Sequence, residues 1–279
     1  MRNKITHFLK TAEGYLSGEE ISRHIKISRA GIWKYIQELR EEGYDIVAVP
    51  HLGYRLISSP DKLLPAEIQF ELGTNILGKD IRYFDSIDST MDVAFQLGVE
   101  GVGEGTVVCA ESQTKGKGRL GRNWVSPKGK GIYMSVILRP RLMPADLTPL
   151  TLLCAVAVCE AAGKFCDGQA KIKWPNDILV HNKKLAGILT ESSAEMDRVR
   201  FVVVGIGINA NAPLSQLPEN YTSIKNETGQ KVSRVVLMQE ILRSLERWYI
   251  ILGKQGFASV ITRWKELSST LGRHVRLVD

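Results

Sequence analysis

A basic, glycine-rich stretch between two apolar runs places the strongest constraint on how this chain can fold. It spans Glu111–Trp124 and reads E-S-Q-T-K-G-K-G-R-L-G-R-N-W. Gly116, Gly118 and Gly121 fit the spacing G-x-G-x-x-G. A dinucleotide-binding fold needs a helix to open at the third glycine, but here a proline and more glycines lead into a second strand-like run at 132–138. The stretch also lacks the closing G-K-[S/T] of a P-loop. Both nucleotide-binding folds are therefore excluded.

The same stretch is suited to holding an anion. Glycines allow close backbone approach, and N–H groups exposed in such a loop can cradle phosphate. Between Glu111 and Gly131 there are six cations and one anion, whereas the first sixty residues hold nine cations and seven anions. The overall charge of +7 is thus concentrated here, which favours a small anionic ligand over nucleic acid. A mobile, solvated surface loop is the alternative interpretation.

Length and composition indicate a soluble protein of more than one domain. The chain has 279 residues, of which 44% are hydrophobic and 24% charged. We expect no membrane span and no secretory leader, so the cytoplasm is the expected location. Cys109, Cys154, Cys159 and Cys166 form no C-x-x-C pair and are predicted to be small buried hydrophobes.

The first sixty residues fit the plan of a winged helix-turn-helix. Helices are predicted at about 4–13, after a capping box that starts at Ser17, and at 28–42, followed by short strands at 45–49 and 53–57. The 28–42 helix would be the recognition helix. Its candidate DNA-binding residues are Ser28, Arg29, Trp33, Lys34 and Gln37. A small helical domain for protein contacts is the alternative.

The rest of the chain predicts a catalytic domain with a mixed, largely antiparallel sheet. A linker is expected at 61–66 and the domain at 67–270. Strand-like runs are joined mostly by hairpins, and helices are expected at 64–72, 90–97, 148–165, 234–252 and 257–267. This arrangement indicates the α+β class.

Five motifs in order resemble one family. They are D-S-T at 88–90, the glycine-rich loop, K-W-P-N-D at 173–177, K-L-A-G at 184–187 and G-I-G-I-N at 205–209. Together with the winged helix-turn-helix they resemble the biotin protein ligases that also act as biotin-operon repressors. The resemblance implies a catalytic domain of the biotin/lipoate ligase type, which is similar to class II synthetases.

The resemblance also implies roles for individual residues. It assigns catalysis to Lys184, Arg119 and Asp177, with Asp177 as a candidate Mg²⁺ ligand. The biotin site would comprise Ser89, Thr90, Gln113, Lys117, Gly118, Arg119, Lys184 and Gly187. The adenylate site would comprise Gly116, Arg122, Trp124, Asn176 and Asn209, with packing as the alternative role of Trp124.

Two positions depart from the family pattern. Met91 stands where some relatives have asparagine, and we leave it out of the polar site. Lys117 stands where arginine is familiar, which keeps the charge but loses the bidentate fork.

The function implied by the resemblance is ATP-dependent biotin activation. Biotin and Mg-ATP would give biotinyl-5′-AMP, and the biotin would pass to a lysine of a biotin carboxyl carrier protein. Operator DNA and a ligand-promoted homodimer are the other implied partners. Relatives carry a further small β domain, and 271–279 resembles the start of its first strand. We therefore expect this C-terminal β domain to be missing here. One alternative is a DNA-binding regulator that senses biotin or biotinyl-5′-AMP and has weak or no ligase activity because that domain is absent. A lipoate-attaching relative is another.

Overall fold

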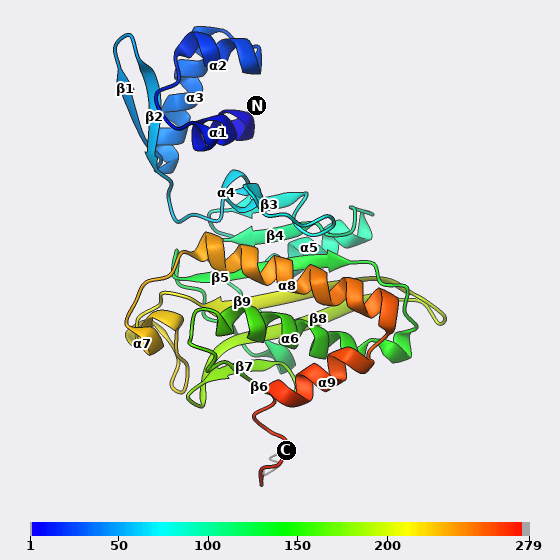
Figure 1. Cartoon of the computed structure of the whole chain (residues 1–279). Coiled ribbons are helices and arrows are strands. Elements are labelled where there is room, and N and C mark those ends of the chain that lie inside the picture. The colour runs from blue at the N-terminus through cyan, green and yellow to red at the C-terminus, as the bar shows by residue number, and fades with distance from the viewer. Residues whose placement is uncertain (1, 275–279) are drawn as a thin grey trace. The chain divides into compact units, whose positions relative to one another are not determined.

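The computed structural model describes residues 2–274. They form two compact units, and the boundary along the chain lies between Glu71 and Leu72. The first unit contains α1 (Arg2–Thr11), α2 (Gly18–Ile25), α3 (Arg29–Glu42), β1 (Asp45–Val49) and β2 (Gly53–Ser58), shown in Figure 1. The two strands pair antiparallel as a hairpin. Three helices followed by this hairpin confirm the predicted winged helix-turn-helix.

Local sequence explains where the helices of this unit begin and end. The Ser17 hydroxyl accepts a hydrogen bond from the Glu20 N–H, and the Ser28 hydroxyl accepts one from the Gly31 N–H. Each bond satisfies a donor that the first turn of a helix leaves without a partner. Gly43 ends α3 with a φ of 105°, in the left-handed region that glycine tolerates. The core between these helices is aliphatic and includes Ile21, Ile32, Ile36 and Leu39.

Helix α4 (Pro65–Gln69) belongs to the first unit. The buried Glu67 carboxylate accepts a hydrogen bond from Tyr44 Oη at 2.7 Å and pairs with Lys10 Nζ at 2.6 Å. The Lys10 ammonium also lies 4.5 Å from the centre of the Phe70 ring. The sequence predicts a linker at 61–66 and the catalytic domain from 67, whereas these contacts place α4 with the winged helix-turn-helix.

The second unit is built on one mixed sheet. Its strand order is β3-β4-β5-β9-β8-β7-β6. The strands are β3 (Ile81–Phe84), β4 (Val107–Ala110), β5 (Gly131–Leu138), β6 (Lys171–Lys173), β7 (Asp177–Val180), β8 (Lys183–Ala194) and β9 (Val199–Asn209). The β3–β4 pair is parallel, and the other pairs are antiparallel. This confirms the predicted α+β class with a mixed, largely antiparallel sheet.

Helices cover both faces of the sheet. Figure 1 shows α6 (Thr148–Gly163), α8 (Arg234–Gln255) and α9 (Ala258–Leu267) together on one face. On the other face α5 (Thr90–Val99) packs on β4, β5 and β9 around Phe201 and Val203. Because side chains alternate along a strand, odd-numbered positions of β9 face α5. Gly205 and Gly207 therefore lie on the α5 side of the sheet.

Helix α6 is a core helix. Residues 144–163 are long and apolar enough to cross a membrane by length and composition, and 56% of the most apolar window is buried inside the structure. The helix packs against β8, α8 and α9, and it has buried residues on all of its sides. The sequence predicts a helix at 148–165, and α6 confirms it. The four cysteines are buried, also as predicted.

Short elements complete the described chain. They are α7 (Ile224–Thr228) and the 3₁₀ turns at Arg119–Gly121, Pro144–Asp146 and Leu214–Gln216. After α9 the chain runs back beside β6, where Ser269 N–H donates to Ile172 O at 2.8 Å. Of the segment 271–279, for which the sequence predicts a strand, residues 275–279 lie outside the described residues.

Candidate functional site

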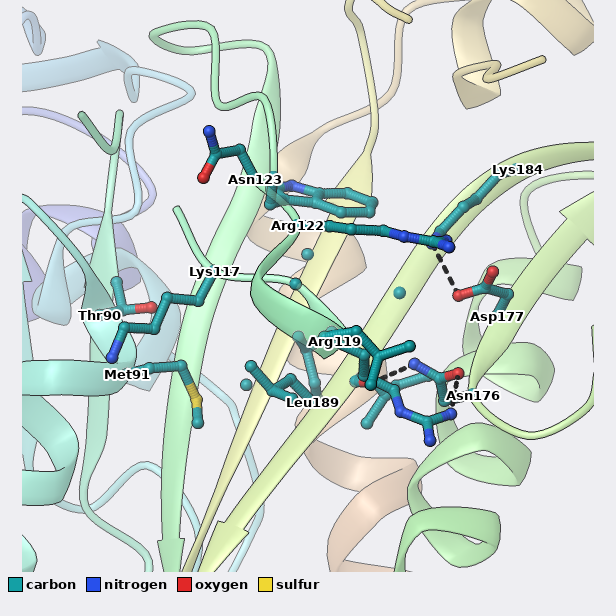
Figure 2. Close-up of a pocket in the computed structure, with 18 of the residues that line it drawn as sticks. Thr90, Met91, Lys117, Arg119, Arg122, Asn123, Asn176, Asp177, Lys184 and Leu189 are labelled. Carbon is teal, nitrogen blue, oxygen red and sulfur yellow. Dashed lines mark hydrogen bonds and ion pairs between the residues drawn. The ribbon is translucent and has the colours of Figure 1, made fainter. Parts of the chain in front are cut away.

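A pocket of about 240 Å³ lies on the α5 side of the sheet. Three elements surround it: the start of α5, the turn at residues 174–177, and residues 116–124, which we call the lid loop (Figure 2). The lid loop doubles back on itself, because Trp124 N–H donates to Gly116 O and Gly118 N–H donates to Arg122 O, at 2.8 and 2.7 Å. No helix follows the last glycine, and the chain continues into β5, as the sequence predicts.

Glycines in β9 leave room for two large side chains on the sheet. A Cβ on Gly207 would lie 2.5 Å from Trp124 Cε2, and a Cβ on Gly205 would lie 2.4 Å from Met91 Sδ. Both distances are shorter than Cβ contacts in real proteins, so a side chain at either position would force its neighbour to shift. The indole of Trp124 and the thioether of Met91 therefore pack directly on backbone. Trp124 is buried and at the same time lines the pocket.

One side of the pocket is neutral and hydrogen-bonded. Gln113 Oε1 accepts from both the N–H and the hydroxyl of Thr90, at 2.9 and 3.0 Å, and Gln113 Nε2 donates to Ser126 Oγ at 3.0 Å. Ser135 Oγ donates to Thr90 Oγ1 at 2.9 Å. We call Thr90, Gln113, Ser126 and Ser135 the neutral side. A buried network of this kind holds amide and hydroxyl groups in fixed directions, as recognition of a polar, uncharged ring requires.

The opposite side of the pocket is charged. Lys184 Nζ pairs with Asp177 Oδ1 at 2.7 Å, and it lies 5.4 Å from the ring centre of Tyr221 and 5.6 Å from that of Trp124. Figure 2 shows Arg122 extended toward this side, and Arg119 reaches Asn176, where Nη1 donates to Oδ1 at 3.2 Å. We call Arg119, Arg122, Asp177 and Lys184 the charged side. Three cations around one carboxylate can bind a phosphate group.

Three lysines between Glu111 and Gly131 are paired with aspartates. Lys115 pairs with Asp88 at 2.8 Å, Lys128 with Asp85 at 2.5 Å, and Lys117 with Asp92. These aspartates precede the loop in the sequence, so they were not included when the charges between Glu111 and Gly131 were counted. The local excess of positive charge is therefore smaller than predicted, and the pocket-lining arginines account for more of it.

Most of the predicted catalytic, biotin and adenylate residues line the pocket. They are Thr90, Gln113, Lys117, Gly118, Arg119, Arg122, Trp124, Asn176, Asp177, Lys184 and Gly187. Ser89, Gly116 and Asn209 do not line it. Asn209 Nδ2 donates instead to Thr222 O at 3.0 Å, and the buried Ser89 hydroxyl has no hydrogen-bond partner in the described part of the chain.

Sequence reasoning missed Tyr221 and left out Met91, although both line the pocket. Tyr221 sits in a loop without a recognised motif, and backbone hydrogen bonds of its neighbours Asn220 and Thr222 to Lys184 bring it to the site. Met91 was set aside because it is not polar. Its position directly after the D-S-T motif could have indicated that it forms an apolar part of the pocket wall.

The residues fit a magnesium ion that arrives with a nucleotide. Among residues 2–274 no three His, Cys, Asp or Glu side chains gather into a metal-binding group. Asp177 is a single carboxylate already paired with Lys184. Mg²⁺ is commonly held by one or two carboxylates together with substrate phosphates, so Asp177 suits that arrangement.

The recognition helix α3 presents three of its predicted DNA-binding side chains to solvent. Arg29, Trp33 and Lys34 are exposed, and Gln37 is half-buried. The Ser28 side chain caps the helix. The Arg29 guanidinium lies 3.2 Å from the carboxylate of Glu19 on α2. The exposed basic and aromatic groups suit contact with phosphates and base edges.

Comparison with known proteins identifies the class of both units. Residues 1–55 match the family described as "HTH domain", and residues 83–209 match the "Biotin/lipoate A/B protein ligase family". The solved biotin protein ligase of Aquifex aeolicus in complex with biotin and ATP superposes with a TM-score of 0.60 at 29% identity, over 70% of this chain and 80% of that one. These matches define the class of protein: a helix-turn-helix unit joined to a unit with the biotin/lipoate ligase fold.

Full-length relatives narrow this class to one family. The Bifunctional ligase/repressor BirA of Bacillus spizizenii is 42% identical over 99% of this chain and 86% of its own length. The Escherichia coli protein of the same name is 32% identical over 94% of this chain and 81% of its own length. The chain therefore belongs to the family of bifunctional biotin ligase/repressors, which confirms the predicted resemblance.

Proposed function

We propose that this protein joins biotin to ATP, forming biotinyl-5′-AMP and pyrophosphate, and then transfers biotin to a lysine of a biotin carboxyl carrier protein. The observation that carries the proposal is a pocket that has a neutral, hydrogen-bonding side and a charged side. Such a pocket suits a ligand with an uncharged polar ring at one end and a carboxylate, later a phosphate, at the other. The bifunctional relatives support the same reaction.

Biotin is assigned to the neutral side of the pocket. Its ureido ring would meet Thr90 and Gln113, and the buried hydroxyl of Ser89 is a further donor close by. The chain of carbon atoms would extend over Gly187 toward the charged side, below Gly118. Trp124 and Met91 supply apolar surface along this path. In this position the carboxylate lies near Lys184.

The charged side is assigned to the reacting carboxylate and phosphate. A free carboxylate is a poor acyl donor, so its oxygen attacks the α-phosphate of ATP and pyrophosphate leaves. Negative charge spreads over the phosphate oxygens in the transition state, where fixed cations stabilise it. Lys184, Arg119 and Arg122 are the cations in place. Asp177 would hold Mg²⁺, which would neutralise part of the phosphate charge.

Other residues orient the nucleotide without reacting. Asn176 holds Arg119, Trp124 offers an aromatic face, and Gly116 and Asn209 keep the backbone that surrounds them in place. The carrier lysine then attacks the mixed anhydride, its nitrogen forms the amide, and AMP leaves with the bonding electrons. Because the acyl group passes directly from the adenylate to the carrier, the enzyme needs no nucleophile of its own.

The first unit is assigned to operator DNA. The exposed face of α3 carries Arg29, Trp33 and Lys34, and a homodimer formed with bound adenylate would present two such helices to a two-fold operator. Repression of biotin-synthesis genes in the cytoplasm is the corresponding regulatory role. A gel shift on the biotin operator tests this: a complex that depends on biotin and ATP is expected, and ligand-independent binding contradicts the coupling.

A regulator that senses biotin without ligating it is the competing function. A sensor of free biotin has no use for three cations, Lys184, Arg119 and Arg122, on one side of its pocket. The deciding experiment incubates the protein with biotin, Mg-ATP and a carrier domain, and follows the mass of the acceptor lysine by mass spectrometry. We expect one biotin per carrier. Release of pyrophosphate without transfer of biotin to the carrier contradicts the ligase assignment, and so does the absence of both.

A further inference from the structure

Two cations of the lid loop point to opposite sides of the pocket. The Lys117 ammonium is paired with the carboxylate of Asp92, which lies on α5. The Arg119 guanidinium donates to Asn176 Oδ1 at 3.2 Å. In Figure 2 the Lys117 amine lies toward Thr90 and Met91, and Arg119 lies beside Asn176. The lid loop is thus held on both sides by side chains.

The backbone hydrogen bonds of the lid loop hold its base, and side chains hold the part nearer its tip. The hydrogen bonds from Trp124 N–H and Gly118 N–H close the base of the turn within the loop itself. At its tip, Leu120 is 87% exposed. Between this closed base, where Trp124 is buried, and the exposed tip, Lys117 and Arg119 contact the rest of the unit through their side chains.

The groups that face Lys117 are anionic. Its hydrogen bond with Asp92 raises the pKa of Lys117 above the usual lysine value, and Glu191 on β8 raises it further by a small amount. Burial acts in the opposite direction but does not outweigh them. Lys117 thus remains an ammonium at neutral pH.

Resting on the proposed function, we propose that Asp92 and Lys117 form a positioning pair that anchors the lid loop to α5, and that Lys117 does not itself contact the adenylate phosphate. Arg119, Arg122 and Lys184 already occupy the charged side, while the Lys117 amine is held by a carboxylate on the other side. A loop anchored at two opposite points opens less often. The pair would therefore slow the escape of biotinyl-5′-AMP.

A double-mutant cycle tests the pair. Wild type, Asp92→Asn, Lys117→Gln and the double variant are loaded with biotin and Mg-ATP, freed of excess ligand, and followed for release of biotinyl-5′-AMP. Each single variant should release the adenylate about two- to fivefold faster, the range for exposed ion pairs. The double variant should be no faster than either single one, because both remove the same contact.

The matched control is Asp88→Asn. Asp88 pairs with Lys115, and neither residue lines the pocket, so release should match wild type. Asp92→Glu should restore slow release. Added salt should speed release from wild type but not from Asp92→Asn, because screening removes what the variant already lacks.

Several outcomes would overturn the pair. A Lys117→Gln effect far larger than that of Asp92→Asn, or additive effects, would mean that Lys117 binds the phosphate. Slower release from Asp92→Asn would mean that Asp92 competes with the ligand. If the wild type forms no adenylate, the proposed function fails, but the ion pair can still be tested by trypsin cleavage of the lid loop after Arg119 and Arg122. Cleavage should be faster in Asp92→Asn than in Asp88→Asn. Equal cleavage rates would contradict the proposed anchoring.

Discussion

The two sides of the pocket handle polarity in different ways. On the neutral side, Thr90, Gln113, Ser126 and Ser135 bond to one another, and each is buried or half-buried. On the charged side, the groups remain partly exposed, and the side chains of Lys184 and Asp177 are 22% and 24% exposed. Fixed neutral groups select a shape, while partly hydrated charges can exchange partners when a ligand arrives. The comparison suggests that selectivity and chemistry reside on different sides.

The largest expected effect comes from the charged side. Lys184→Ala should slow adenylate formation about 100- to 1,000-fold, the usual cost of removing a fixed donor from developing charge. Single-turnover release of pyrophosphate measures it. Lys183→Ala is the matched control, since Lys183 is the exposed neighbour outside the pocket. An equal loss in both variants would show that general charge, and not this ammonium, drives the reaction.

A smaller effect is expected from the neutral side. Gln113→Leu removes hydrogen bonds to the Thr90 N–H and to Ser126, and a lost buried bond costs about 1–3 kcal/mol. We expect biotin affinity to fall roughly 10- to 100-fold, since about 1.4 kcal/mol is tenfold. Calorimetric titration of biotin measures it, with exposed Gln96→Leu as the control. Loss of ATP affinity with biotin binding intact would reverse the assignment of the two sides.

A third expected effect, on stability and not on activity, concerns the backbone that Trp124 packs against, between the two sides. Gly207→Ala places a methyl group within 2.5 Å of the Trp124 ring, and overpacking costs about 1–3 kcal/mol. Thermal unfolding should therefore shift to lower temperature. Gly253→Ala, in α8 with no atom within 4 Å of the added Cβ, should raise stability by about 0.5–1 kcal/mol. A neutral Gly207→Ala variant would mean that Trp124 can move aside freely.

Sequence alone predicted the features that depend on short segments. The caps at Ser17 and Ser28, the recognition helix and the hairpin after it follow from spacing within a few residues. The family motifs named most pocket residues. The class of the sheet followed from strand runs joined by hairpins, although the parallel β3–β4 pair was not predicted.

Contacts between distant segments were beyond the reach of the sequence. Lys117 and Asp92 are 25 residues apart, and Lys128 and Asp85 are 43 apart. A count of charge within the loop could not include partners that only the fold brings close. Tyr221 was missed for the same reason, because its position depends on backbone pairing with Lys184.

The docking of α4 matters for anyone who wishes to isolate the DNA-binding part. A fragment that ends at Pro60, where the sequence suggests a boundary, would remove Glu67 from beneath Lys10 and Tyr44. It would also uncover the face of α1 that Phe70 now covers. A fragment that ends at Glu71 keeps both contacts and is the natural choice for expression and crystallisation with an operator half-site.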